Sequence, residues 1–166
     1  DVDRLERLGM PEAIFCEGKD DAALKAIVAD LAQPTLFTRL SPDRYAALNA
    51  ADTGMDYDPR SHTAFLHGTL LPTFGRVAVV TAGTSDLRVA GEALRTLQFS
   101  GVTAELTADV GVAGIHRLLA RIDHIRSFDI VIVVAGWDAA LASVMGGLVG
   151  QPVIAVPSST GYGVAA

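Results

Sequence analysis

Hydrophobic and polar positions follow two different patterns along the second half of this chain. From residue 75 onward, short continuous apolar runs alternate with segments whose apolar residues recur every three or four positions. Continuous apolar runs are typical of strands buried on both faces, and apolar residues spaced three or four positions apart are typical of amphipathic helices. Their alternation predicts a parallel sheet covered by helices on both faces, a three-layer α/β/α sandwich.

The two hydrophobic patterns predict the strands and helices of this half. We expect strands at residues 76–83, 103–109, 129–136 and 152–158, and helices at 85–98, 114–125 and 138–150. Each helix has an inward apolar stripe. The stripes are Leu87, Ala90, Leu94 and Leu97; Ile115, Leu118, Leu119 and Ile122; and Leu141, Val144, Met145 and Leu148.

The first half reads as a smaller α/β segment. Residues 12–16 and 35–40 are predicted strands, and an apolar stripe predicts a helix at 20–32. Ser41 followed by Pro42 is a typical helix start. Residues 49–72 read as a linker, because 52–60 is polar and turn-rich and "SHTAFLHG" is ambiguous. We therefore divide the chain into residues 1–72, the small segment with its linker, and 73–166, the larger α/β domain.

Composition narrows the class of protein. The 166 residues are 50% hydrophobic, carry a net charge of −6 and show no basic stripe, so nucleic acid is not an expected partner. No apolar run has the roughly 18–20 residues of a membrane span. One cysteine, Cys16, precludes an intrachain disulfide and favours a reducing, cytoplasmic location. The first residue is not Met and the last follows a strand-like segment, so we expect both ends to be incomplete.

Polar and glycine-rich clusters follow each predicted strand of the larger sheet. Parallel strands end at the same edge, where ligands bind, so we expect the clusters to face one crevice. They are Gly83–Asp86; Asp109–Gly111 leading to His116 and Arg117; Gly136–Ala139; and Pro157–Gly161.

The residues of these clusters have alternative structural roles. Backbone N–H groups at the start of the helix after Gly83 would bind phosphate or carboxylate, but Thr84 or Ser85 is equally a helix cap and Asp86 a first-turn acid. Neither usual glycine-rich nucleotide motif is present. His116 lies off its helix stripe and could bind phosphate or transfer a proton, or be a surface histidine.

Similar alternatives hold elsewhere. Asp138 could be a functional carboxylate or a helix cap, and Trp137 could stack on a planar ring or simply pack. Gly146 and Gly147 lie inside a predicted helix, which suggests close approach of another backbone. Cys16 reads as a buried structural thiol. The other histidines, His62, His67 and His124, show no metal-ligand spacing.

Several stretches together resemble one known family. "MPEAIFCEGK", "LFTRLS", "VVTAGTSDLRVAGEA", "DVGVAGIHRLL" and "VIVVAGWDAALASVMGGLVGQPVIAVPSSTGYG" resemble the LarB family of pyridinium-3,5-biscarboxylic acid mononucleotide synthases. The second half is also similar to the class I PurE enzymes. That similarity implies a flavodoxin-like sheet and a homo-oligomer, an octamer in PurE enzymes.

LarB resemblance implies a definite reaction. The substrate would be nicotinic acid adenine dinucleotide, carboxylated at C5 of its pyridinium ring with CO2 or bicarbonate as co-substrate. Hydrolysis of the phosphoanhydride would release AMP, and the product would begin the nickel-pincer nucleotide cofactor. Mg2+ on the phosphates is a possible cofactor, since hard cations prefer oxygen ligands.

The resemblance also assigns residues. Asp138 and His116 would be catalytic, with Asp138 in place of the family's more frequent Glu. The nucleophilic cysteine is expected beyond Ala166, and Cys16 does not match it. Substrate binding would fall to Gly83, Thr84, Ser85, Asp86, Asp109, His116, Arg117, Gly136, Trp137, Asp138, Ala140, Pro157, Ser158 and Ser159.

Two other functions fit parts of the pattern. One is a PurE-type carboxylase or mutase of aminoimidazole ribonucleotide, which the "GTSD" turn supports equally. The N-terminal segment and "DVGVAGIHR" count against it. The other is a nucleotide-binding module without its nucleophile.

Overall fold

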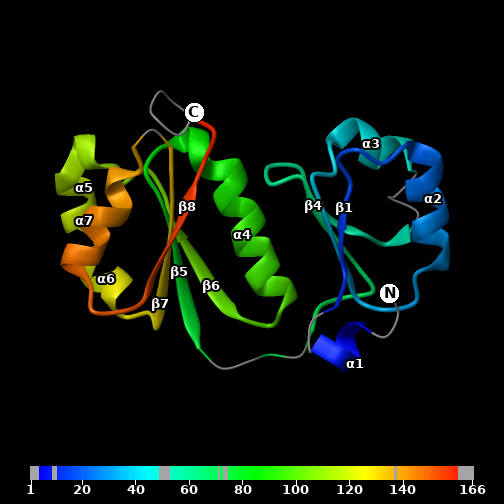
Figure 1. The fold of residues 1–166 in the computed structure, drawn as a ribbon, viewed down its shortest axis with the longest axis horizontal. Helices are drawn as coiled ribbons and strands as arrows, with labels where there is room; N and C mark the ends of the chain where they lie inside the picture. The colour runs from blue at the N-terminus through cyan, green and yellow to red at the C-terminus, as the bar shows by residue number, and fades with distance from the viewer. Residues whose placement is uncertain are drawn as a thin grey trace.

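Two four-stranded sheets make up the molecule, one in each half of the chain (Figure 1). The computed structural model describes residues 4–8, 11–48, 53–70, 72, 75–136 and 138–160. Among these residues there is no helix with the length and apolar character to cross a bilayer.

The second sheet is parallel throughout, with strand order β6-β5-β7-β8. Its strands are β5 (Arg76–Thr81), β6 (Thr103–Thr107), β7 (Ile130–Ala135) and β8 (Val153–Pro157). The central strands β5 and β7 are largely buried, as their continuous apolar runs predict. The edge strands are covered less than we expected: Ile154 of β8 is 49% exposed.

Helices cover both faces of this sheet, which confirms the three-layer, flavodoxin-like sandwich (Figure 1). One face holds α5 (Ile115–Leu119), α6 (Ile122–Arg126) and α7 (Ala140–Leu148). The other face packs against α4 (Leu87–Phe99), whose Ala90 is buried beside Val79 and Val134.

The single helix expected at residues 114–125 is wrong. The chain instead forms a 3-10 turn, η3 (Val112–Gly114), followed by the short helices α5 and α6. The change of direction after Leu119 buries Leu118, Ile122 and Ile125 and leaves Ile115 and Leu119 exposed. The expected inward stripe of this helix is therefore half wrong, because Ile115 and Leu119 face outward and not toward the sheet.

The linker expected at residues 49–72 is also wrong in part, because it contains two strands of the first sheet. That sheet has the order β1-β2-β4-β3, with β1 and β2 parallel and β4 antiparallel to both of its neighbours. The strands are β1 (Ala13–Phe15), β2 (Thr35–Thr38), β3 (Asp56–Asp58) and β4 (Thr63–Leu66). Every residue of β4 is buried because the strand is central in the sheet.

The helices of the first half begin where the sequence predicts. Asp20 caps α2 (Asp21–Asp30) by accepting the N–H of Ala23 at 2.7 Å, and Ser41 caps α3 (Pro42–Ala47). The further helix α1 (Arg4–Leu8) precedes this sheet. Cys16 is fully buried in the core below α2, as expected, and burial raises its pKa to about 11.

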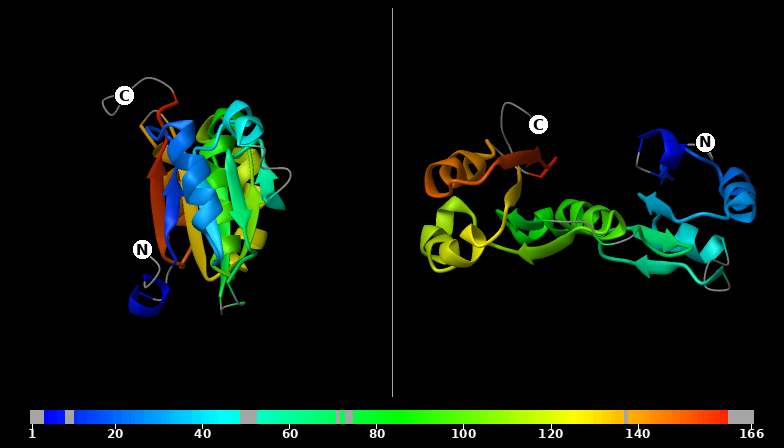
Figure 2. Two further views of the ribbon diagram at one scale, coloured as in Figure 1. Left: turned by 90° about the vertical axis from the view of Figure 1, so that its right-hand side faces the viewer. Right: turned by 90° about the horizontal axis from the view of Figure 1, so that it is seen from below.

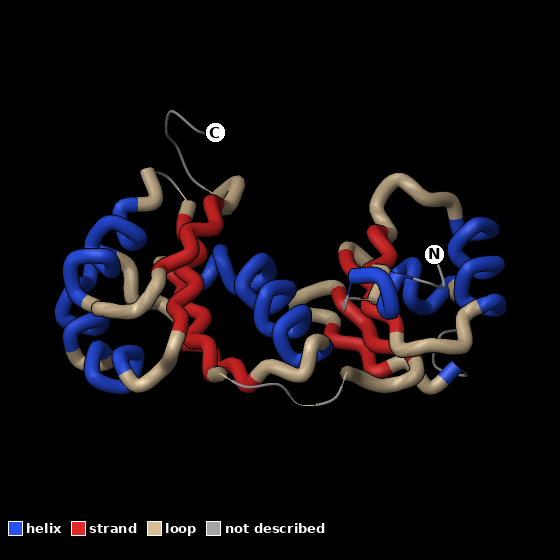
Figure 3. The backbone as a smooth tube through the Cα atoms, turned by 60° about the horizontal axis from the view of Figure 1, so that its bottom comes forward, coloured by secondary structure: helices blue, strands red, loops and turns tan. Residues whose placement is uncertain are grey.

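Helix α4 joins the two halves by packing on both sheets (Figures 2 and 3). Its last residue, Phe99, shares a buried cluster with Leu36 and Phe65 of the first sheet. Arg95 of α4 lies over the ring of Phe65 at 3.6 Å and donates to Asp56. The helix that begins beside the candidate site thus also carries the first half of the molecule.

Candidate functional site

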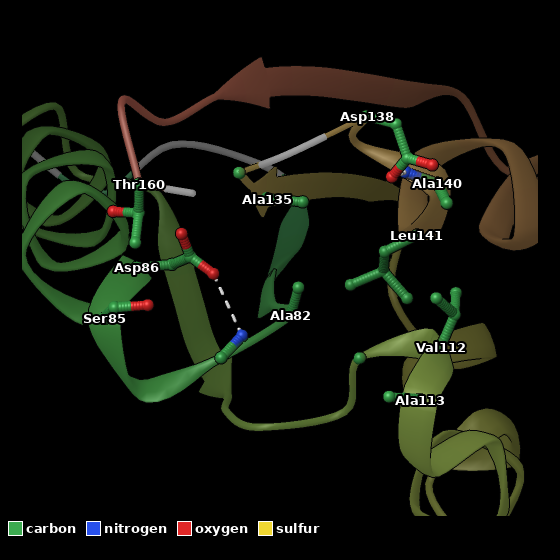
Figure 4. Close-up of a pocket in the computed structure, with 13 residues that line it drawn as sticks. Ala82, Ser85, Asp86, Val112, Ala113, Ala135, Asp138, Ala140, Leu141 and Thr160 are labelled. Carbon is green, nitrogen blue, oxygen red and sulfur yellow. Dashed lines mark hydrogen bonds between the residues drawn. The ribbon is translucent and has the colours of Figure 1, made fainter. Parts of the chain in front are cut away.

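A cavity of about 270 Å³ opens at the carboxyl edge of the parallel sheet (Figure 4). The loops that follow β5, β6, β7 and β8 all reach it. This is the edge at which ligands bind in open parallel sheets. The described lining residues are Ala82, Gly83, Ser85, Asp86, Gly111, Val112, Ala113, Ala135, Gly136, Asp138, Ala140, Leu141 and Thr160.

Small residues keep the cavity open where the strands end. The N–H of Gly111 donates to the carbonyl of Ala82 at 2.9 Å, and a Cβ on Gly111 would lie 2.6 Å from that oxygen. A Cβ on Gly136 would lie 1.8 Å from the carbonyl oxygen of Thr160. Neither position accepts a side chain without moving backbone, so glycine is required at both.

One wall is the turn that begins at Gly83 and runs into η2 (Thr84–Asp86) and α4. The cap of this turn is neither Thr84 nor Ser85, because the carboxylate of Asp86 folds back and accepts the N–H of Gly83 at 2.9 Å. Asp86 is only 3% exposed, and its other oxygen accepts the hydroxyl of Ser158 at 2.5 Å. Ser85 is exposed at the cavity, whereas Thr84 lies outside its lining.

The opposite wall is largely apolar and is formed by η3 and the start of α7 (Figure 4). Val112, Ala113 and Leu141 face the cavity there. Asp138 lies at the same wall, exposed, and accepts the N–H of Ala140, the first residue of α7, at 3.2 Å. The N-cap residue of α7 is Ala139, so Asp138 supports the start of the helix from the position before the cap and also lines the cavity.

The loop after β6 holds three expected binding residues away from the cavity lining. Asp109 donates its backbone N–H to the hydroxyl of Thr81 and accepts a hydrogen bond from Arg117 at 3.4 Å. His116 is exposed on α5. Asp109, His116 and Arg117 lie outside the lining, which this part of the chain reaches through Gly111, Val112 and Ala113.

The remaining expected residues are divided. Pro157, the last residue of β8, and Ser159 are exposed and lie outside the lining, and Ser158 is hydrogen-bonded to Asp86. Trp137 lies outside the described residues. Gly83, Ser85, Asp86, Gly136, Asp138 and Ala140 are the expected residues that line the cavity.

The sequence interpretation did not include most of the apolar lining. It missed Ala82, Val112, Ala113, Ala135 and Leu141 as lining residues. Ala82 and Ala135 each precede a glycine at a strand end, a small-residue pair that could have marked the floor. The apolar stripe of its helix predicts that Leu141 is a core residue. In the structure it packs in the core and also lines the cavity.

The lining carries negative charge. Its charged side chains among the described residues are the carboxylates of Asp86 and Asp138, with no lysine, arginine or histidine. In the described parts of the chain, three or more His, Cys, Asp or Glu side chains do not gather into a metal-binding group. The described residues therefore show no group that would hold Mg2+ by protein ligands alone. Mg2+ held mainly by the substrate phosphates stays a prediction, and we derive no step through that ion.

The parallel, flavodoxin-like sheet with a cavity at its carboxyl edge defines an α/β protein with a strand-end ligand site, and the family models place it in a carboxylase-type enzyme family. Residues 76–165 match the family model of AIR carboxylase, and residues 1–68 match that of the LarB/PurE-like N-terminal domain. The chain belongs to the LarB family. It is 36% identical over 176 residues to an uncharacterized protein of Methanocaldococcus jannaschii, an alignment that covers 99% of this chain and 69% of that protein.

Proposed function

We propose that this chain supplies the substrate site of a LarB-type synthase. The enzyme would carboxylate C5 of the pyridinium ring of nicotinic acid adenine dinucleotide and hydrolyse its phosphoanhydride, giving the biscarboxylated mononucleotide and AMP. The observation that carries the proposal is the strand-end cavity in a chain whose two halves match the LarB/PurE-like and AIR carboxylase family models.

The two walls suggest how the substrate is oriented. A phosphate would lie beside Ser85 at the start of η2, because the first backbone N–H groups of a helical turn have no partner within the turn. The ring would lie against Val112 and Leu141, whose apolar side chains form the opposite wall. The carboxylate of Asp138 lies on the ring side and favours a cationic pyridinium over a neutral ring.

The chemistry needs a nucleophile that makes the ring electron-rich. A cysteine thiolate, placed by the resemblance beyond Ala166, would add to the pyridinium ring and give a neutral dihydropyridine. Its C5 then attacks the carbon of CO2, forming the new C–C bond. Loss of the C5 proton and expulsion of the thiolate restore the aromatic ring. In a separate step, water attacks phosphorus and AMP leaves.

Within the described chain, we assign the C5 proton to Asp138. It is the exposed carboxylate of the cavity, whereas the oxygens of Asp86 are occupied by Gly83 and Ser158. His116 lies outside the lining, so we give it no proton transfer. Replacing Asp138 by Asn should lower kcat about 100-fold, the scale of a lost general base. Asp138→Glu should retain more activity, and a kcat for Asp138→Asn equal to that of the wild type would remove this role.

A second candidate is a carboxylase of aminoimidazole ribonucleotide, favoured by the match of residues 76–165 to AIR carboxylase. Parallel assays of the full-length protein with that nucleotide and with nicotinic acid adenine dinucleotide separate the two. We expect turnover of the dinucleotide alone. Turnover of aminoimidazole ribonucleotide alone would replace our proposal with the second.

We also propose that the protein is a homo-oligomer. Val112, Ile115 and Leu119 form an apolar stripe on η3 and α5, each 39–49% exposed, that continues the cavity wall. On α7, a Cβ added at Gly146 or Gly147 would meet no atom within 4 Å in the described chain, so the glycines are not explained by packing within it. Light scattering of Leu119→Asp against the wild type tests this, with a smaller assembly as the expected result. An unchanged mass would contradict it.

A further inference from the structure

Three consecutive backbone N–H groups after β6 donate to the end of β5. The N–H of Asp109 donates to the side-chain hydroxyl of Thr81 at 3.1 Å, and the N–H of Val110 donates to the carbonyl of Thr81 at 3.0 Å. The N–H of Gly111 donates to the carbonyl of Ala82 at 2.9 Å. Any residue would supply the two carbonyls, so the hydroxyl is the one acceptor of the three that depends on a threonine side chain.

The hydroxyl of Thr81 holds a strained residue. Asp109 has a left-handed backbone with φ of 57°, which is unfavourable for an L residue other than glycine, although aspartate tolerates it better than most. Such a conformation persists where surrounding contacts hold it. Thr81 has no exposed surface, whereas the ion pair between the carboxylate of Asp109 and Arg117 is about half exposed. The buried hydrogen bond is therefore the stronger constraint on the backbone of Asp109.

Thr81 stands between the two walls of the cavity. Directly after it, Ala82 and Gly83 line the cavity and lead into the turn that carries Ser85. The loop that bonds to Thr81 continues into Val112 and Ala113 of η3, which lie across the cavity from that turn (Figure 4). One buried side chain thus connects the segments that form the polar and the apolar wall.

We propose that Thr81 is a positioning residue for the substrate site. Its hydroxyl fixes the backbone of Asp109 and thereby holds Val112 and Ala113 at the separation from the β5 turn that sets the width of the cavity. Valine has the shape of threonine but would leave the N–H of Asp109 without this acceptor. The inference rests on the proposed function only in taking the cavity as the substrate site.

The consequence is a specific division of kinetic effects. The proposed function places the pyridinium ring against Val112, a contact made alike in the bound substrate and in the transition state. Loss of such a contact raises KM and leaves kcat nearly unchanged. A merely structural effect of the substitution would instead lower the folded fraction, which reduces the apparent kcat and does not change KM.

The test compares Thr81→Val with Thr81→Ser, which retains the hydroxyl, in the full-length protein. The matched control is Thr35→Val, because Thr35 is a buried threonine of the first sheet whose hydroxyl donates to the carbonyl of Gln33 at 2.9 Å. Amide hydrogen exchange at Asp109 and Gly114 is measured without ligand, followed by kcat and KM with nicotinic acid adenine dinucleotide. Exchange at Gly114 reports on η3, since its N–H donates to the carbonyl of Gly111 at 2.9 Å.

In Thr81→Val we expect about tenfold faster exchange at Asp109 and Gly114 and about tenfold higher KM, the scale of a buried donor left without its acceptor. The kcat should change less than about twofold. Thr81→Ser should resemble the wild type, and Thr35→Val should leave KM and both exchange rates unchanged. Unchanged exchange at either amide in Thr81→Val would overturn the proposal, and so would a KM raised equally in Thr35→Val.

The exchange measurement also separates this inference from the proposed function. Turnover of neither candidate nucleotide would remove the proposed function, while exchange at Asp109 and Gly114 would still decide whether Thr81 holds the wall. Thr81→Ala is measured in the same way, so that the test does not depend on the folding of one variant. In the wild type, exchange at Asp109 as fast as in an unfolded chain would by itself overturn the proposal.

Discussion

At the scale of single residues, burial separates the groups available for chemistry from those that hold the fold. Asp138 and Ser85 are exposed at the cavity, whereas Cys16 has no exposed surface. Burial raises the pKa of the Cys16 thiol to about 11, although Arg44 and Lys19 act to lower it. A thiol in this state is a packing group and not a nucleophile.

Cys16 should therefore resist alkylation in the folded protein. At pH 8 only about one thiol in a thousand would be ionised, compared with about a quarter of free thiols. We expect iodoacetamide to modify Cys16 slowly in native buffer and fully in guanidinium chloride, as followed by the mass of the peptide containing it. Rapid modification of the native protein would contradict the buried assignment.

Asp58 should stabilise the first sheet in a pH-dependent way. Burial acts to raise its pKa, but hydrogen bonds from Ser61 and Arg60 outweigh burial and the pKa is lowered. Its stabilisation is thus present above the unfolded pKa of about 4 and is lost as pH falls through the lower folded pKa. Asp58→Ala should lower the free energy of unfolding by about 1 kcal/mol at pH 7.

Chemical unfolding at several pH values checks this effect. The difference between Asp58→Ala and the wild type should shrink as pH falls below about 4. Asp30→Ala is the control, because Asp30 is exposed at the end of α2. A difference that is constant with pH would show that the carboxylate charge is not responsible.

The sequence located the cavity residues only partly, for a physical reason. Strand ends mark the edge where Gly83, Gly136 and Asp138 gather, because parallel strands must end together. It could not show that Asp86 accepts the hydroxyl of Ser158, since that hydroxyl comes from a segment 72 residues away. Nor could it show that η3 turns His116 away from the lining.

At the scale of elements, α4 has two packing faces. Ala90 contacts the parallel sheet, while Gly91 approaches the loop of the first half so closely that a Cβ would lie 2.9 Å from Cβ of Ser61. Helical glycine is unfavourable by itself, so the close approach explains its presence.

Gly91→Ala should consequently destabilise the protein in spite of alanine's better helix propensity. We expect a loss of about 1–3 kcal/mol, the usual cost of overpacking. The exposed α4 position Gln98, changed to Ala, should stay within about 0.5 kcal/mol of the wild type. Urea unfolding measures the free energy of unfolding of both variants. A Gly91→Ala protein more stable than the wild type would show that the space beside Ser61 accommodates a methyl group.

The elements differ in how well the sequence predicts them. The strands β5 and β7 are continuous apolar runs that end at turn residues, and α7 has a clear apolar stripe, so their local patterns suffice. The strand β3 has three residues and lies inside the polar, turn-rich stretch at residues 52–60, and β4 has four residues just after it. β4 is recognised as a strand only through its pairing with β2 and β3. Pairing of this kind is a long-range property that local patterns do not contain.

At the scale of the whole molecule, the two sheets are joined by polar contacts from α4. The side chain of Arg95 is 13% exposed, lies over Phe65 and bonds both Asp56 and Thr63. Arg39 of the first half pairs with Glu92 of α4, but its side chain is 35% exposed. Buried contacts of a planar guanidinium are worth more than exposed ion pairs.

Arg95→Ala should loosen the first half from α4. We expect the free energy of unfolding to fall by about 2 kcal/mol and protease cleavage between the two sheets to accelerate. Arg39→Ala, the matched control, should cost less than about 1 kcal/mol. Arg95→Lys should not restore stability, since lysine lacks the planar fork. An equal loss of unfolding free energy in Arg95→Ala and Arg39→Ala would contradict the prediction that Arg95 contributes more than an exposed ion pair.

The most direct test of the proposed function is the fate of carbon from labelled bicarbonate. The full-length protein is incubated with nicotinic acid adenine dinucleotide and ¹³C-bicarbonate, and the products are resolved by mass spectrometry and ¹³C NMR. Our account predicts AMP together with a mononucleotide that carries the label in a new carboxylate on C5 of its ring. Recovery of unlabelled dinucleotide without AMP would contradict it.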